Sequence, residues 1–124
     1  MNPTDLNALS RDALRGHPDA ADCTLYRPDP GDPEEELDLG DGKVLIGAPF
    51  EPPQAWDAAE REAFFGDLAP ERFVLARIVL DDAATEPVPG DVLAVSLANS
   101  DVQTYFVEDR QDQLYVLLRD EFDD

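Results

Sequence analysis

Residues 89–122 read PGDVLAVSLANSDVQTYFVEDRQDQLYVLLRDEF, and this stretch decides the fold class. Three apolar runs alternate in it with short polar segments, a pattern typical of strands joined by tight turns. The turns are predicted at Asn99-Ser100 and over residues 109–113, where short polar side chains hydrogen-bond their own backbone. The apolar runs consist of Val92, Leu93, Val95 and Leu97, then Val102, Tyr105, Phe106 and Val107, then Leu114, Tyr115, Val116, Leu117 and Leu118. The stretch therefore predicts an antiparallel meander of three strands.

The length of the chain, 124 residues, suits one hydrophobic core, and we expect a single domain over residues 1–124. The fold is predicted to be mainly β, a small β-sandwich or barrel containing the antiparallel meander, with an N-terminal helix and one short middle helix. The expected parts are a helical arm at 1–16, two strands around an acidic loop at 22–50, a short helix at 53–65 and an antiparallel β core at 71–122.

Targeting signals are missing from the sequence. No apolar run approaches the roughly 20 residues of a membrane helix, and the N-terminus lacks the basic and apolar regions of a signal peptide. We therefore expect the protein in the cytoplasm of the cell that makes it. The lone Cys23 can form neither an internal disulfide nor a structural zinc site, and it is expected to be a small core residue.

Charge is the strongest compositional signal, because 29 acidic residues against 9 basic ones give a formal net charge of −20. Lys43 is the only lysine. This balance disfavours direct nucleic-acid binding, which relies on cationic contacts to phosphates. Three alternatives remain: acid that only solubilises the surface, acid that lines a surface past which DNA moves, or acid that imitates DNA phosphates for a basic partner.

The N-terminal segment is predicted to form one helix that ends at Gly16. Leu6, Leu9, Ala13 and Leu14 fall on one face of such a helix. About three turns with a narrow apolar stripe are not stable alone, so the arm must dock either on its own domain or on another subunit. In the second alternative, the candidate partner contacts are Leu6 and Leu9.

Residues 28–42 combine prolines, glycines and carboxylates, and the composition predicts an extended loop after a strand at 22–27. The alternatives are a solvated connection, an assembly contact and a calcium loop. The calcium alternative is weak, because DLGDG (residues 38–42) lacks the order of oxygen ligands that this motif needs. The candidate partner contacts in this loop are Asp29, Asp32, Glu34, Glu35, Glu36, Asp38 and Asp41.

The middle of the chain predicts a strand at 43–50, a helix at 53–65 ended by Gly66, and a strand at 71–80 that is apolar enough to be covered on both faces. Trp56, Phe64 and Phe65 are interpreted as core residues, with an exposed docking patch as the alternative. Arg77 interrupts the strand, and we expect it at a sheet edge or paired with a carboxylate.

Catalytic residues are scarce. His17 is the only histidine and lies beside Pro18 in an expected loop, which disfavours a Ser-His or Cys-His pair. The sequence contains neither of the glycine-rich nucleotide-binding motifs nor a His/Cys metal cluster. We therefore predict that the chain is not an enzyme and that it uses no cofactor or metal.

The order of these segments resembles the small head–tail joining, or tail-attachment, proteins of lambda-like phages and prophages. The similarity covers most of the chain, and its motifs are short. They are CTLYRP at 23–28, VLIGAPF at 44–50, ARIVLDD at 76–82, GDVLAV at 90–95, YFVED at 105–109 and LYVLLRD at 114–120.

The resemblance implies a structural virion protein, present in the host cytoplasm during assembly, that forms a ring at the phage neck. Its partners would be the head connector on one side and tail proteins on the other, around the DNA channel. The acidic loop and the tail at 120–124 would contact partners or line that channel. The first alternative is an acidic DNA mimic that occupies the basic groove of a nucleic-acid enzyme. The second is a stand-alone bacterial domain whose acidity only solubilises it.

Overall fold

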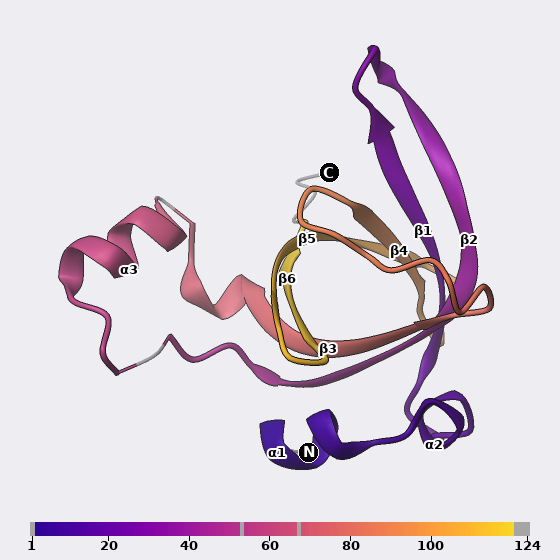
Figure 1. Ribbon diagram of the computed structural model, residues 1–124, viewed down its shortest axis with the longest axis horizontal. Coiled ribbons are helices and arrows are strands. Elements are labelled where there is room, and N and C mark those ends of the chain that lie inside the picture. Colours follow the sequence, from indigo (N-terminus) through magenta and orange to yellow (C-terminus); the bar gives the residue numbers. More distant parts are fainter. Residues whose placement is uncertain (1, 53, 67, 121–124) are drawn as a thin grey trace.

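The computed structural model describes residues 2–52, 54–66 and 68–120. Six antiparallel strands close into a barrel in the order β1-β2-β3-β6-β5-β4 (Figure 1). The predicted mainly β fold is confirmed, and of sandwich and barrel the structure has the barrel. The elements are α1 (Pro3–Ala8), α2 (Arg11–Arg15), β1 (Ala21–Asp29), β2 (Asp32–Pro49), α3 (Ala58–Phe65), the 3-10 turn η1 (Pro70–Arg72), β3 (Phe73–Leu80), β4 (Val92–Ser96), β5 (Val102–Gln111) and β6 (Leu114–Arg119).

The meander predicted from residues 89–122 is confirmed as β4, β5 and β6, with β5 between the other two. Both of its turns contain a residue in the left-handed region, Ser100 at φ 70° and Asp112 at φ 56°. In the first turn the Asn99 side chain accepts a hydrogen bond from the Asp101 amide at 3.2 Å. The second turn is shorter than expected, because β5 continues to Gln111 and only two residues separate it from β6.

Side chains alternate between two core clusters. The barrel interior is filled by buried residues from all six strands, as small barrels require. These are Cys23, Leu25, Val44, Ala76, Ile78, Leu80, Leu93, Val95, Tyr105, Val107, Tyr115 and Leu117. A second cluster lies on the outer face, where the helices cover the sheet. Its members are Leu6, Leu14, Leu45, Phe50, Phe65, Phe73, Leu75, Val79, Leu114, Val116 and Leu118. β3 contributes to both clusters, so this strand is covered on both faces as predicted.

Cys23 lies inside the barrel with 3% of its surface exposed, which confirms its expected place in the core. Burial raises the pKa of the Cys23 thiol to about 12, and the nearby carboxylates of Asp22, Asp41 and Asp81 act in the same direction. The thiol is therefore protonated at neutral pH. Because the thiolate is the reactive form, Cys23 is inert in the folded chain.

We expect Cys23 to resist labelling by a disulfide reagent at pH 8 until the chain unfolds. A pKa of about 12 in place of 9.0 lowers the thiolate fraction at this pH about a thousandfold. The folded thiol keeps its proton between these two values while the unfolded thiol loses it, so stability should fall as pH rises from 9 to 12. Labelling kinetics with and without urea measure the first effect, and urea melts across that pH range measure the second. Rapid labelling of the native chain contradicts this account.

The N-terminal arm is two short helices, so the prediction of one helix to Gly16 is wrong. The backbone becomes extended at Leu9 (ψ 134°), and Ser10 begins α2 by accepting a hydrogen bond from the Ala13 amide at 3.1 Å. A serine that caps locally competes with continuation of the helix. The break lets Leu6 and Leu14 both reach the outer face of the barrel, where each is fully buried. The helices lie against one side of it (Figure 1).

Arg77 is 5% exposed and pairs with Leu45 of β2, while the register between β3 and β6 ends one residue earlier, at Ala76↔Tyr115. The expected edge position therefore holds locally, on the β6 side of β3, but the expected carboxylate partner is not found among the described residues. The Arg77 Nη1 atom donates to the carbonyl oxygens of Leu6, Asn7 and Leu9 at 3.1, 3.3 and 2.7 Å. A cation suits this position, because the last carbonyls of a helix have no partner within the helix.

The middle helix is shorter than the predicted 53–65, because Asp57 caps it by accepting from the Glu60 amide at 2.9 Å. Residue 53 lies outside the described residues. Gly66 ends the helix at φ 58°, as expected. The core interpretation is confirmed for Phe65, which is buried. Trp56 and Phe64 are half-buried and pack against the same outer cluster, with Phe64 5.3 Å from Phe50 and 5.4 Å from Trp56 between ring centroids. None of the described helices is long and apolar enough to span a membrane.

Candidate functional site

A long hairpin made by β1 and β2 extends beyond the barrel (Figure 1), and its outer part carries most of the predicted contact residues. The expected loop at 28–42 is therefore wrong. The register continues from Ala21↔Val44 to Asp29↔Asp32. Proline and glycine are tolerated here because the outer part is an edge, where Pro28 needs no ladder hydrogen bond on its solvent side. We call residues 27–41 the acidic hairpin.

The acidic hairpin leaves the barrel at a bulge in β2. Leu25 pairs with Gly40 but Tyr26 pairs with Asp38, so Leu39 is an extra residue on this strand. Gly40 has φ 111°, a conformation that side chains rarely adopt, and its amide donates to the Asp38 carboxylate at 2.8 Å. A bulge bends and twists its strand, and this bend turns the acidic hairpin away from the rest of the sheet.

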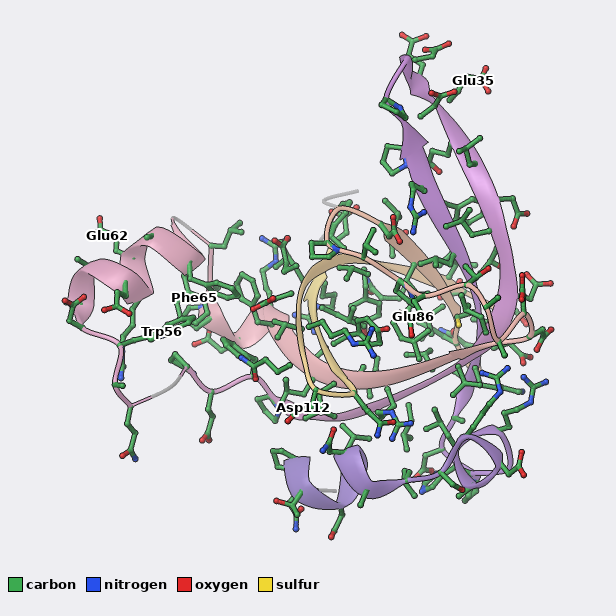
Figure 2. The ribbon with its side chains drawn as sticks, in the orientation of Figure 1. Glu35, Trp56, Glu62, Phe65, Glu86 and Asp112 are labelled. Atoms are coloured by element: carbon green, nitrogen blue, oxygen red, sulfur yellow. The ribbon has the colours of Figure 1, made fainter. Side chains whose placement is uncertain are left out.

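Among the described residues, no strand pairs with either outer edge of the acidic hairpin. β4 pairs with β1 from Cys23 to Tyr26, and β3 pairs with β2 from Gly42 onward. Within the described ranges, the outer edges of residues 27–40 therefore have no neighbouring strand. Figure 2 shows Glu35 near the hairpin tip, well away from the barrel. Uncovered strand edges are sites where another chain can add, unless charge or twist prevents it.

The charge of the acidic hairpin is almost entirely negative. It carries seven carboxylates, and Arg27 is the one cation among residues 27–41. Strand alternation puts Glu36 and Asp38 on the same face, so their charges repel one another. Asp29 is half-buried and the other six carboxylates are exposed; these are Asp32, Glu34, Glu35, Glu36, Asp38 and Asp41.

The base of the hairpin is anchored by Arg27, which sequence reasoning did not single out. Its Nε and Nη2 atoms donate to the two carboxylate oxygens of Asp91 at 2.8 and 3.0 Å. Asp91 is 1% exposed and also accepts from the Val88 amide at 2.9 Å. The Asp91 hydrogen bond raises the pKa of the Arg27 guanidinium. This bidentate pair fixes the hairpin to the loop before β4.

A signal for Asp91 was present in the sequence. The carboxylate stands directly before the apolar strand 92–96, in the GDVLAV motif, where burial without a partner would be costly. Its partner was not predictable, because 64 residues separate Arg27 from Asp91 and no local pattern links them.

Leu6 and Leu9, the two predicted contact residues of the arm, are less exposed than most of the acidic ones. Leu6 is fully buried on the chain's own barrel, and Leu9 is half-buried against the same outer cluster. In this structure the arm therefore docks on its own domain. An ideal Cβ on Gly47 would lie 2.5 Å from Leu6 Cδ2, which shows how closely α1 approaches β2. Of the predicted acidic tail, residues 121–124 lie outside the described residues.

Groups for catalysis are not assembled around His17. Its Nδ1 atom accepts a hydrogen bond from the Asp19 amide at 3.1 Å, which is a local turn contact. In the described part of the chain, no group of three or more His, Cys, Asp or Glu side chains is arranged to hold a metal ion.

Comparisons of this chain with family models, with curated proteins and with solved structures find no match.

Proposed function

We propose that this chain is a structural adaptor that contacts other proteins through its acidic hairpin. The observation that carries the proposal is a two-stranded extension with seven carboxylates and uncovered edges, held at its base by the ion pair of Arg27 with the buried Asp91. An isolated hairpin of two strands is marginally stable in water, and like charges weaken it further. Contact with a partner offsets both costs.

The setting that we propose is the neck of a phage particle, between the head connector and the tail. The sequence resemblance supports this setting, and two structural facts are compatible with it. The barrel interior is filled with side chains, so a channel for DNA would have to lie between copies in a ring. An acidic hairpin facing that channel would repel DNA phosphates and keep the DNA from adhering.

A second candidate function is DNA mimicry, because the acidic hairpin carries seven carboxylates on an extended ribbon, with Glu36 and Asp38 on one face of β2. Such a protein occupies the basic groove of a nucleic-acid enzyme. It binds stoichiometrically, and salt weakens the binding. The neck adaptor instead forms rings or is captured by connector and tail proteins.

The proposal predicts that neutralising the hairpin abolishes assembly and leaves the fold intact. The variant replaces four exposed carboxylates by amides: Asp32, Glu34, Glu35 and Glu36. Its matched control changes the same number of exposed carboxylates elsewhere: Glu51, Glu60, Glu62 and Glu71. Since the net charge is equal in the two variants, a difference between them reports the position of the charge.

The measurement is electron microscopy of the chain after co-expression with phage head-connector and tail proteins. We expect rings or joined complexes with the wild type and the control, and at least a tenfold loss with the hairpin variant. Equal assembly by both variants refutes the adaptor role. Tight one-to-one binding to a nucleic-acid enzyme, lost on hairpin neutralisation, favours the DNA mimic instead.

A further inference from the structure

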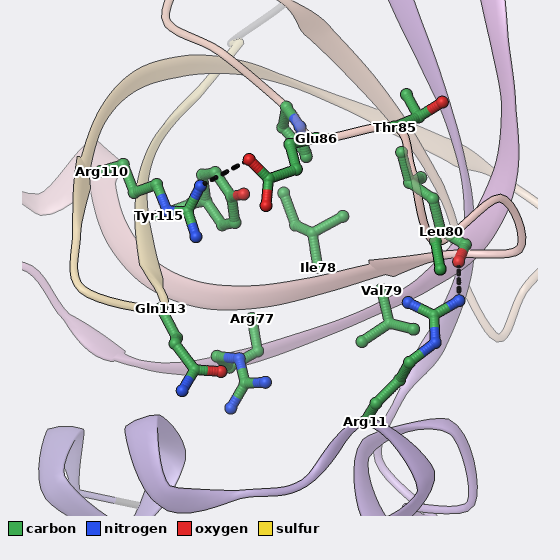
Figure 3. A pocket seen from close by; sticks show the side chains of 12 residues that line it. Arg11, Arg77, Ile78, Val79, Leu80, Thr85, Glu86, Arg110, Gln113 and Tyr115 are labelled. Atoms are coloured by element: carbon green, nitrogen blue, oxygen red, sulfur yellow. Dashed lines mark hydrogen bonds and ion pairs between the residues drawn. The ribbon is translucent and has the colours of Figure 1, made fainter.

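Three arginines line one pocket, although the chain is strongly acidic. The Arg11 guanidinium donates to the Leu80 carbonyl oxygen there. The pocket has a volume of about 180 Å³ and lies between β3, the end of β5 and the loop before β4. Arg11, Arg77 and Arg110 reach it from α2, β3 and β5 (Figure 3). The one acidic residue among its lining residues is Glu86, so three positive charges and one negative charge give a formal +2 there. The whole chain carries −20.

Arg77 provides a buried positive charge without a carboxylate partner among the described residues. Its Nη1 atom is satisfied by three backbone carbonyls of the arm. No fully buried side-chain nitrogen or oxygen of the described residues lacks a partner, so the remaining Nε and Nη2 atoms of Arg77 keep some contact with solvent. Arg77 is one of the residues that line the pocket. Burial lowers the pKa of the Arg77 guanidinium, which reflects the cost of holding this charge away from water. An anion in the pocket offsets that cost.

Arg110 has a weak and exchangeable acidic partner. Its Nη1 atom lies 3.3 Å from Glu86 Oε2, and the two side chains are 39% and 67% exposed. Its position is fixed by other contacts, because Nε donates to the Asp112 carbonyl at 2.8 Å and the guanidinium lies 5.3 Å from the Tyr115 ring centre. Exposed ion pairs of this kind contribute little to the stability of the fold. A bound anion can therefore replace Glu86 without moving Arg110.

We propose that this pocket is a binding site for a small oxyanion, whose recognised group is a carboxylate or a phosphate. The guanidiniums supply the charge, and Gln113 and Tyr115, which carry a side-chain amide and a hydroxyl group, line the same space. Since a water molecule takes roughly 30 Å³ in the liquid, the volume suits one such group with a few waters. This site is separate from the acidic hairpin and does not depend on the adaptor function.

The test is an NMR titration of the full chain labelled with ¹⁵N, observing the arginine Nε and Gln113 side-chain signals at pH 7. Sodium phosphate and sodium succinate are the two probes, and sodium chloride holds the ionic strength constant. We expect saturable shifts at Arg77, Arg110 and Gln113 with half-saturation on the order of 1 mM. Saturation by one probe alone identifies the preferred group. Absence of saturation by both overturns the proposal.

Variants separate the pocket from general surface charge. Arg110→Gln should weaken binding at least tenfold, and Glu86→Gln should strengthen it several-fold by removing the competing carboxylate. The control is Arg61→Gln on α3, an exposed position outside the pocket, which should leave the affinity unchanged. If Arg110→Gln perturbs the fold, Arg11→Gln replaces it. Equal affinity in a folded pocket variant and the control overturns the site.

Discussion

Gly42→Ala is expected to prevent stable closure of the barrel. Gly42 pairs with Leu80 of β3 and with Cys23 of β1. A Cβ at this position would lie 2.1 Å from the Val79 carbonyl oxygen and 2.7 Å from Leu80 Cα. Both are backbone atoms, so relief requires β3 to move away from β2. Overpacking a core typically costs 1–3 kcal/mol, and we expect a destabilisation of about 3 kcal/mol or more because no side chain can rotate away.

Thermal and urea unfolding followed by circular dichroism measure this effect. Domains of this size have a total stability of roughly 5–15 kcal/mol, so the variant should melt on the order of 10 °C lower or fail to fold. Gly31→Ala is the matched control. Its Cβ would meet only the Asp29 carboxylate, at an ordinary 3.5 Å, and we expect a change within about 0.5 kcal/mol. A Gly42 variant that melts like this control contradicts the close approach of the strands.

Phe73→Ala should produce the second large loss of stability. Phe73 is 1% exposed and begins β3, where its ring lies 5.0 Å from Phe65 and 5.4 Å from Phe64 between centroids. These contacts join α3 to the outer face of the barrel. Removing a buried phenylalanine costs about 3–5 kcal/mol, because apolar contact is lost and the cavity closes only in part.

Trp56 gives this variant a local probe, since it is the only tryptophan and lies 5.4 Å from Phe64. We expect its fluorescence to shift to the red in Phe73→Ala under conditions where the strands remain folded, as α3 loosens before the barrel opens. Val102→Ala, at a side chain 62% exposed, should leave both the melt and the fluorescence unchanged. If Phe73→Ala is as mild as Val102→Ala, the aromatic cluster does not hold the helix.

The sequence predicted elements where local signals agreed. Alternating apolar residues and polar turns located β4, β5 and β6, and continuous apolar character located β3 with both faces covered. Local propensity predicted the wrong structure where pairing between two strands outweighed it. The prolines, glycines and repelling carboxylates of residues 28–42 favour a loop, yet β1 supplies a paired neighbour as far as Asp29. The apolar spacing of the arm likewise fits one continuous helix, so it did not indicate that Ser10 caps a second helix.

By itself, then, the sequence determined the β class, the strands of the meander, the burial of Cys23 and the concentration of acid between residues 28 and 42. Those properties follow from the composition and alternation of neighbouring residues. Only the tertiary structure decided the closure of the barrel, the projection of the acidic hairpin, the Arg27–Asp91 pair and the placement of Arg11, Arg77 and Arg110 around one pocket. These depend on pairing between segments that lie far apart in the chain, where register and burial are set jointly and no local pattern reports them.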